Sequence, residues 1–306
     1  MKVANRLNEP SFFSGDLREQ RRGPCARKGI VALTMAMTLG AAAQAPVDVG
    51  DLLARVGERV EESYHRARSV ICAESVVMQP LRSDWTTEGP ARLLEYELRV
   101  SWEPTTDGTP SAASVLRRLV KVGGRAPRAD AEPGCMDPHA VSPEPLAMLL
   151  PDQRGEYVFS WTGSSRVGKR PAIVLRYRSR AVGKAEATWK GDCVNFSLPG
   201  RSEGRIWIDP STHEVLRFDE SLTGRFDYPL PRERARYGAP PSFVIERADS
   251  SIRYRPVAFH DPEETLLLPE RIESFQVIHG ASVPRLRTTQ TFSNYQRFVT
   301  ETRIVR

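Results

Sequence analysis

Between positions 47 and 67, apolar residues recur at intervals of three and four, which is the repeat of an α-helix with one buried stripe. The intervening positions hold mainly Arg, Glu and His, and the polar face carries glutamates at 58, 61 and 62. Negative charge on that face disfavours binding to a membrane surface. The sequence therefore predicts an amphipathic helix that packs on a protein core through Val49, Leu52, Leu53, Val56, Val60 and Tyr64.

After Arg68 the repeat shortens to two residues. Between Arg92 and Trp102, large apolar side chains alternate strictly with charged or hydroxyl side chains. This pattern is typical of a strand in an antiparallel sheet with one buried face and one solvated face. The same alternation predicts strands at 173–178, 205–209, 252–255 and 286–292, and further strands are expected at 70–78, 115–122, 157–161, 215–222, 243–248 and 272–278.

Short polar segments with Gly, Pro or Asp separate the predicted strands, as expected of turns. The expected turns lie at 123–124, 163–168, 209–213, 249–251 and 279–280. A short second helix is predicted at Pro143–Leu150, with Ser142 as its cap. Residues 126–142 and 225–241 are interpreted as long loops rich in Pro, Arg and Gly. No linker divides the strands into two sets, so the sequence predicts one β-rich domain over residues 44–306.

The first 43 residues have the order of parts of a secretory signal peptide. A positive segment between positions 21 and 28 precedes an apolar run over 29–43, and cleavage is expected after Ala43. The alternatives are an uncleaved anchor, for which the apolar core is short, and a twin-arginine signal at Arg21-Arg22, which lacks apolar residues after the pair. The sequence therefore predicts an exported protein of the periplasm or cell envelope, without a stable transmembrane segment after cleavage.

Most of the basic excess of the chain lies in the predicted leader. The formal net charge is +6, but residues 1–45 hold seven Lys and Arg and three acidic residues, so the net charge without them is +2. A nucleic-acid-binding surface needs many cations on one face. The sequence therefore argues against a DNA or RNA partner.

Three cysteines remain after the predicted cleavage, which is an odd number in a compartment where disulfides persist. Cys135 follows a Pro-Gly pair and Cys193 follows a Gly-Asp turn, so a Cys135–Cys193 bridge is predicted. Cys72 lies in an apolar run and is expected to be a buried free thiol. No Cys-x-x-Cys motif is present.

We find no catalytic signature. The five histidines are not paired at metal-ligand spacing, and His213-Glu214 lacks the second histidine that a zinc-protease motif needs. The glycines of 163–168 are at the wrong spacing for a serine-nucleophile turn. Asp219 and Glu220 are adjacent on a predicted strand and should point to opposite faces. The sequence favours a non-enzymatic protein and predicts no metal and no cofactor, although a site assembled from distant strands would leave no local motif.

Arginines occupy the solvated phase of many predicted strands. Glutamates and aspartates are interspersed with them, which favours cross-strand ion pairs on a solvated face. A patch for anionic lipid head groups or acidic glycans is the alternative. The arginines concerned are Arg99, Arg176, Arg178, Arg205, Arg217, Arg253, Arg255 and Arg287.

Two segments resemble a known group of exported proteins. Gly204–Phe218 (GRIWIDPSTHEVLRF) is similar to a recurrent hairpin of lipoprotein-carrier-like (LolA/LolB-type) proteins, and Phe292–Phe298 (FSNYQRF), preceded by Leu266–Pro269, is similar to their closing strands. The resemblance covers about a third of the predicted mature chain. It implies a mainly β (α+β) fold: a large curved antiparallel sheet, or half-barrel, with an N-terminal amphipathic helix and one short additional helix. This chain departs from a minimal carrier in its greater length, its cysteines and its two long loops.

Three functional hypotheses follow. The first is a non-enzymatic envelope protein that binds an apolar ligand, a lipid or an acylated protein in the hollow of a curved sheet. The second is an envelope interaction or assembly protein that uses loops 126–142 and 225–241, and the third is a hydrolase of envelope glycan or lipid. Under the first hypothesis, the residues expected to line the hollow are Tyr96, Leu98, Trp102, Ile206, Ile208, Leu216 and Phe218.

Overall fold

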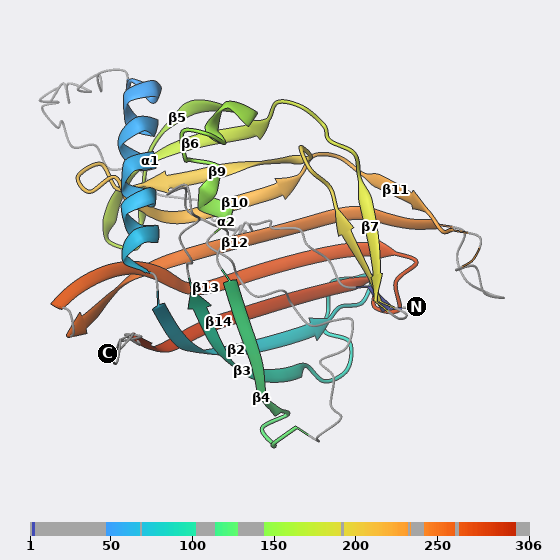
Figure 1. The fold of residues 1–306 in the computed structure, drawn as a ribbon. Helices are drawn as coiled ribbons and strands as arrows, with labels where there is room; N and C mark the ends of the chain where they lie inside the picture. Colours follow the sequence, from blue (N-terminus) through green and yellow to red (C-terminus); the bar gives the residue numbers. More distant parts are fainter. Residues whose placement is uncertain are drawn as a thin grey trace, which may run out of the picture.

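A computed structural model shows a mainly β protein with one long helix (Figure 1). The fold class predicted from the sequence is confirmed: a large, open, curved antiparallel sheet with an N-terminal amphipathic helix and a short second helix. The residues that the structure describes are 2–3, 47–67, 69–101, 114–127, 144–190, 193–231, 233, 242–260 and 263–297.

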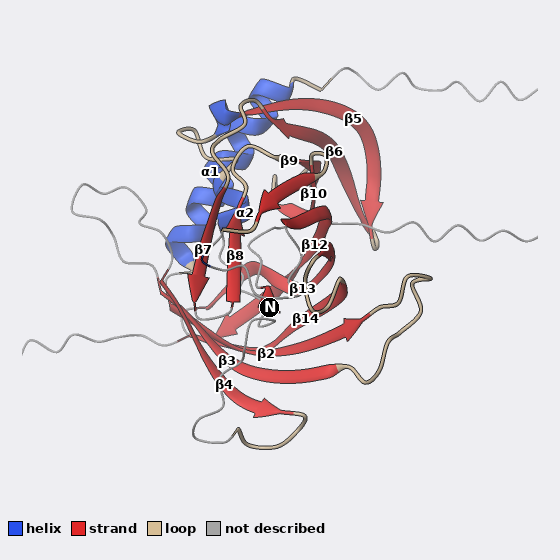
Figure 2. Cartoon of the chain, turned by 90° about the vertical axis from the view of Figure 1, so that its right-hand side faces the viewer, coloured by secondary structure: helices blue, strands red, loops and turns tan. Residues whose placement is uncertain are grey.

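Eleven strands form the main sheet, in the order β4-β3-β2-β14-β13-β12-β10-β9-β6-β5, with β11 paired to β12 beside this path. Every pairing within it is antiparallel. Figure 2 shows the sheet curving around the two helices, with β5 and β4 at its two ends. The strands are β2 (Ser69–Pro80), β3 (Arg92–Ser101), β4 (Ser114–Val122), β5 (Tyr157–Val167), β6 (Arg170–Ser179), β9 (Ser202–Ile208), β10 (Val215–Leu222), β11 (Phe226–Pro229), β12 (Ser242–His260), β13 (Glu263–His279) and β14 (Arg285–Arg297).

Irregularities in register occur in five of the ten strand pairings of this sheet. The pairing shifts between Val215 and Arg217 in β10, between Arg253 and Tyr254 in β12, and between Ser293 and Gln296 in β14. A bulge bends the strand that carries it and increases the local twist. These shifts therefore contribute to the curvature that gives the sheet an inner and an outer face.

Helix α1 (Val49–Arg66) covers part of the inner face. Asp48 caps it, because its carboxylate accepts hydrogen bonds from the backbone N–H of Gly50 (2.8 Å) and Asp51 (3.1 Å). Five of the six apolar residues predicted to face a core are buried, and Val49 packs against the same cluster from its edge. The helix prediction is thus confirmed to within a few residues at each end.

One apolar cluster joins α1 to the strands. Its strand members come from the inner positions of eight strands, and the members outside α1 and the strands follow α2 (Glu144–Ala147). Part of the predicted second helix, Ser142 and Pro143, lies outside the described residues. The buried members of this cluster are Leu52, Leu53, Val56, Val60, Tyr64, Cys72, Leu98, Met148, Leu149, Leu150, Leu175, Tyr177, Ile206, Ile208, Val215, Phe218, Ile252, Ile272 and Phe292.

A second, smaller sheet crosses the inner face away from α1. The hairpin of β7 (Glu186–Lys190) and β8 (Cys193–Ser197) packs Val194 and Phe196 against β12 residues Phe243 and Ile245. The sequence analysis did not predict this hairpin or β11. β8 also pairs in parallel with β1 (Lys2–Val3), which belongs to the predicted leader.

Three predicted turns are wrong in detail. The segment 163–168 is mostly strand, because β5 continues to pair with β6 after a bulge at Thr162, and the turn consists of Gly168 and Lys169. Residues 249–251 lie inside β12, so the two strands predicted on either side of them are one strand of 19 residues. The turn at 279–280 begins after His279, the last residue of β13.

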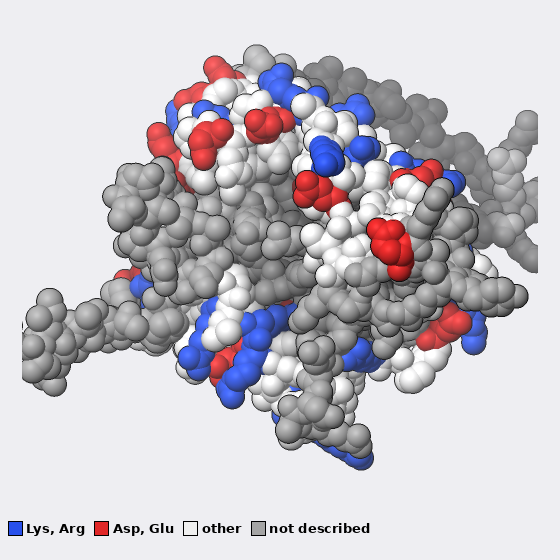
Figure 3. Space-filling view, turned by 45° about the vertical axis from the view of Figure 1, so that its right-hand side comes forward, with Lys and Arg blue, Asp and Glu red and all other residues white. Residues whose placement is uncertain are grey.

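Charged side chains of both signs are interspersed on the face that Figure 3 shows. Among the described residues, no helix combines the length and the hydropathy that a membrane crossing requires.

Gly57 allows α1 to approach the segment that follows α2. A Cβ atom at this position would lie 2.9 Å from the carbonyl oxygen of Leu149. In an unhindered helix, Gly to Ala stabilises by up to about 1 kcal/mol. We expect Gly57→Ala instead to lower the free energy of unfolding by about 1–3 kcal/mol, because backbone atoms must move to relieve the clash. Urea unfolding, with Gly155→Ala as a control in open space, measures this; a more stable Gly57→Ala variant would contradict the close approach.

Candidate functional site

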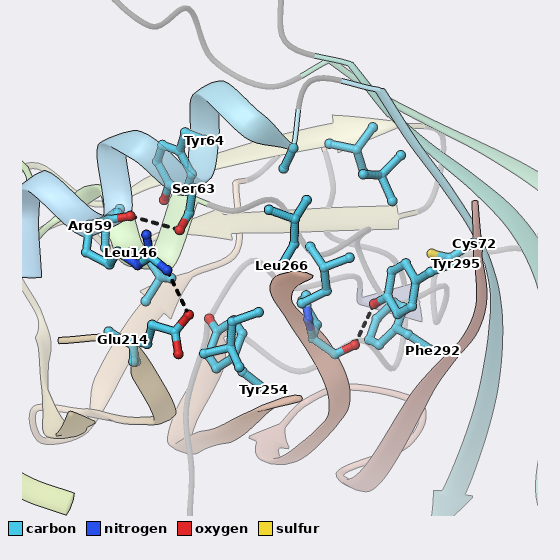
Figure 4. A pocket seen from close by; sticks show the side chains of 18 of the residues that line it. Arg59, Ser63, Tyr64, Cys72, Leu146, Glu214, Tyr254, Leu266, Phe292 and Tyr295 are labelled. Carbon is cyan, nitrogen blue, oxygen red and sulfur yellow. Dashed lines mark hydrogen bonds and ion pairs between the residues drawn. The ribbon is translucent and has the colours of Figure 1, made fainter. Parts of the chain in front are cut away.

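A cavity of about 110 Å³ lies between the C-terminal half of α1 and the inner face of the sheet. Figure 4 shows α1 residues on one side of it and strand residues opposite them. Its lining is predominantly apolar. The lining residues are Arg59, Val60, Ser63, Tyr64, Ala67, Val70, Cys72, Leu98, Val100, Leu146, His213, Glu214, Val215, Tyr254, Leu266, Leu267, Leu268, Pro269, Phe292 and Tyr295.

Two strand irregularities help to open this space. The β12–β13 register shifts where Tyr254 faces Pro269, and the β14–β2 register shifts next to Tyr295. At a bulge one residue leaves the ladder, so side chains there do not continue the regular inner rows. Tyr295 donates its hydroxyl hydrogen to the carbonyl oxygen of Pro269, which links the two bulges across the cavity floor. Burial raises the pKa of Tyr295 above its usual range, so this hydroxyl remains a donor.

One end of the cavity is polar. Arg59 of α1 forms an ion pair with Glu214 (3.3 Å), and Arg170 contacts both Glu214 (3.1 Å) and Asp209 (2.9 Å). Glu214 and its neighbour His213 belong to the β9–β10 connection, where His213 has a left-handed backbone (φ 58°). The connection is thus tied to α1 and to β6 by charge-assisted contacts.

Asp209 fixes the shape of this connection. Burial acts to raise its pKa, but hydrogen bonds from the Ser211 hydroxyl and from the backbone N–H groups of Ser211 and Thr212 outweigh it and lower the pKa to about 2. The carboxylate is therefore ionised at neutral pH and organises the turn that carries His213 and Glu214.

A second ion-pair cluster holds the last turn of α1. Arg66 donates to Glu264 of β13 (2.8 Å), and Arg297 of β14 contacts the other oxygen of the same carboxylate. The Glu264 side chain is 13% exposed. The two clusters, at Arg59 and at Arg66, connect α1 to the sheet at positions two helical turns apart.

The residues predicted to line a hollow lie in several places. Leu98 lines the cavity, whereas Ile206, Ile208 and Phe218 belong to the same apolar cluster without lining it. Tyr96 lies on the inner face in a neighbouring cluster with Val76, Met78 and Leu94.

Leu216 does not lie with Phe218 as expected. It packs with Ala172, Val174 and Trp207 in a cluster separate from that of Phe218. The register shift between Val215 and Arg217 changes the alternation, so Val215 takes the inner position that the sequence pattern assigned to Leu216. Trp102 and Cys135 lie outside the described residues, so the Cys135–Cys193 bridge stays a prediction; Cys193 begins β8.

Sequence reasoning missed the polar end of the cavity. Arg59 and Glu214 are 155 positions apart, and each taken alone is an ordinary charged residue. The one local indication of this polar end was the segment Gly204–Phe218, which contains Asp209 and Glu214. Its resemblance to a known hairpin assigns no role to any residue. Among the described residues, no group of three or more His, Cys, Asp and Glu side chains is arranged to hold a metal ion.

Comparison with solved structures gives distant matches. They include a DUF1329 family protein from Desulfovibrio piger (TM-score 0.39, 10% identity, covering 82% of this chain and 94% of that chain) and a LolA superfamily protein from Nitrosomonas europaea (TM-score 0.33, 10% identity, 79% and 94%). A third is a putative outer membrane lipoprotein-sorting protein domain from Vibrio parahaemolyticus (TM-score 0.32, 10% identity, 81% and 94%). A LolA superfamily protein is thus among the matched structures, as the sequence resemblance predicted.

No protein-family model matches the chain, and no curated protein matches it. At this identity and TM-score the structural matches carry no argument about function, and no residue role follows from them. The functional argument therefore rests on the cavity itself.

Cys72 is a free, buried thiol in the wall of the cavity. Burial raises its pKa to about 12, and the negative charge of Glu74 acts in the same direction. Because the thiolate is the nucleophile, we expect iodoacetamide at pH 8 to leave Cys72 unmodified in the folded protein and to modify it after urea unfolding. Peptide mass spectrometry measures both states; equal modification in the two would show that the thiol is not buried.

Glu220 is the most perturbed carboxylate of the inner face outside the cavity. It accepts a hydrogen bond from the hydroxyl of Tyr177 (2.8 Å), and burial raises its pKa from 4.5 to about 8. The folded protein therefore binds more protons than the unfolded chain between about pH 4.5 and pH 8, so this group's contribution to stability is lost as pH rises through that range.

We expect Glu220→Gln to remove this loss of stability. Between pH 5 and pH 8.5, the free energy of unfolding of the variant should rise relative to that of the wild type by on the order of 1–3 kcal/mol. Urea unfolding at several pH values gives the difference, and Glu58→Gln on the exposed face of α1 is the matched control. Parallel pH curves for wild type and Glu220→Gln would contradict the assignment.

Proposed function

We propose that the protein binds the apolar chain of an amphiphile, such as the acyl chain of a lipid or of an acylated protein, in the cavity between α1 and the sheet. The observation that carries this proposal is the combination of an empty space with an apolar lining and a polar end built from Arg59, His213 and Glu214. A small-molecule site typically pairs apolar walls with a few oriented polar groups. The bound chain would lie between Cys72 and Leu266, with its polar group toward Glu214.

The volume, about 110 Å³, is below the roughly 300–1,000 Å³ of sites that bury a whole small ligand, so the cavity fits part of an apolar chain. A cavity needs roughly 10–15 Å³ to hold one water molecule. The cavity volume of about 110 Å³ is several times larger. Interiors of folded proteins are otherwise close-packed, and an empty apolar cavity costs stability in proportion to its volume. A ligand that fills the space would recover part of that cost.

Hydrolysis is not favoured by the cavity wall. Its carboxylate, Glu214, is held by two guanidinium groups, and Ser63 donates its hydroxyl hydrogen to the carbonyl oxygen of Arg59 (2.8 Å). The assembly hypothesis relies on loops 126–142 and 225–241, which lie largely outside the described residues. Apolar-ligand binding is therefore the function that the described geometry supports best.

The first test is a chain-length series of saturated fatty acids competing with a fluorescent fatty acid. Each methylene buried contributes about 0.8 kcal/mol, so affinity should rise about fourfold per methylene and then level off when the cavity is full. Native mass spectrometry of the exported protein would show whether a lipid is retained. Affinity that rises without a plateau would indicate adsorption to the surface, and the absence of binding at every length would refute the proposal.

The second test blocks the cavity. Val100 lines it from β3, and Val100→Phe adds volume to a space that is otherwise empty, so the variant should fold and bind the fatty acid at least tenfold more weakly. Val120→Phe is the matched control, because Val120 lies on β4 with 38% of its surface exposed. Thermal unfolding checks that both variants fold; unchanged binding in a folded Val100→Phe would place the ligand elsewhere.

A further inference from the structure

A second hollow lies on the outer face of the sheet, on the side away from α1. It encloses about 610 Å³ and is walled by β5, β6, β9 and β10. It shares no lining residue with the apolar cavity. The residues that line this outer groove are Thr162, Gly163, Ser164, Ser165, Val174, Arg176, Glu203, Gly204, Arg205, Trp207, Asp219 and Ser221.

Strand alternation places these residues opposite the core. Leu175 and Tyr177 belong to the inner cluster, so Arg176 between them points outward, and Ile206 and Ile208 likewise flank Trp207. The groove is shaped by a bulge in β5, where the register with β6 shifts between Trp161 and Gly163. Gly163 has φ 131°, a conformation that L side chains rarely adopt.

Two arginines lie side by side on neighbouring strands that line the groove. Arg176 of β6 and Arg205 of β9 are partners in register, and both are exposed. Like charges at directly opposed positions of a sheet destabilise it. The pair is incompletely neutralised: Arg176 contacts Glu203 (2.8 Å), and Arg205 interacts electrostatically with its cross-strand partner Asp219 without forming an ion pair with it.

The second carboxylate of the groove is already engaged. Asp219 accepts from the Arg217 guanidinium (2.6 Å and 2.5 Å) and from the Ser251 hydroxyl (2.7 Å). It is 4% exposed, and its one negative charge is shared between Arg217 and Arg205, so positive charge is in excess beside it. The arginine pair is therefore available to an incoming anion.

The other lining groups suit a hydroxyl-rich molecule. Thr162, Ser165 and Ser221 bring hydroxyls to the walls, and Trp207 lies at the base with Arg217 over its ring (4.6 Å). Guanidinium groups bind carboxylate and phosphate in a fixed forked geometry. A volume of about 610 Å³ lies within the usual range for small-ligand sites, roughly 300–1,000 Å³.

We infer that the outer groove binds an acidic saccharide, whose anionic group lies between Arg176 and Arg205 and whose hydroxyls contact the serine and threonine side chains. This is a binding function separate from that of the apolar cavity. Neither site needs the other to be occupied, and each is tested by its own variants.

The experiment titrates the exported protein with trigalacturonate and follows binding by isothermal titration calorimetry. Cellotriose, a neutral trisaccharide, and inorganic phosphate are the comparison ligands. We expect trigalacturonate to bind more tightly than either, and Arg205→Gln to weaken it at least tenfold because one charge-assisted contact is lost. Arg99→Gln is the matched control: Arg99 is exposed on β3, outside the groove, and contacts Glu97. Its binding should equal that of the wild type.

Three results would overturn the inference. Equal binding of cellotriose would show that the arginine pair is not used, and equal binding of phosphate would show that the saccharide is not recognised. Absence of trigalacturonate binding to the folded wild-type protein would show that the groove is not a site for this class of ligand. Val100→Phe, which blocks the apolar cavity, should leave trigalacturonate binding unchanged, so the two proposals can fail independently.

Discussion

The structure depends on covering the inner face of a sheet that does not close on itself. The strands bring rows of apolar side chains to that face, and the apolar stripe of α1 packs on these side chains. Full burial of a Leu or Val side chain contributes about 1.5–3 kcal/mol, so Leu52, Leu53, Val56 and Val60 together dominate the attachment of the helix. This attraction is non-directional. It brings α1 to the sheet, but it does not specify where the helix stops or how it is rotated.

Ion pairs fix the position and rotation of α1, which apolar packing alone does not specify. Arg59 reaches Glu214 in the β9–β10 connection, and Arg66 reaches Glu264 in β13. Partly exposed pairs of this kind contribute little free energy, because screening and side-chain entropy offset the Coulomb attraction. Their effect is to fix the orientation of α1 over the place where the β12–β13 and β14–β2 ladders are irregular. The cavity lies at this place, lined by Tyr254, Pro269 and Tyr295 from the irregular positions.

The period of the hydrophobic pattern made most elements predictable. The stripe at 47–67 and the alternation at 92–102 are local properties, and the structure places a helix and a strand there. The alternation of apolar and polar residues does not reveal a bulge. The extra residue between Val215 and Arg217 leaves the sequence pattern apparently regular, so Leu216 was assigned to the wrong face. The β7–β8 hairpin, whose strands have five residues each, was not predicted. The Arg59–Glu214 pair could not be predicted, since it joins segments that meet only after the sheet has formed.

The two faces of the sheet use the same strands without sharing side chains, because successive residues of a strand point to opposite faces. In β9, Ile206 and Ile208 contribute to the apolar interior while Arg205 and Trp207 contribute to the outer groove. A substitution at an outward position therefore leaves the inner rows in place. A substitution at Gly204 would instead displace the backbone. A Cβ atom there would lie 2.0 Å from the carbonyl oxygen of Asp219 and 2.8 Å from the ring of Tyr177. Position 204 touches the outer groove through Asp219 and the inner cluster through Tyr177, so it is where a change on one face would be transmitted to the other.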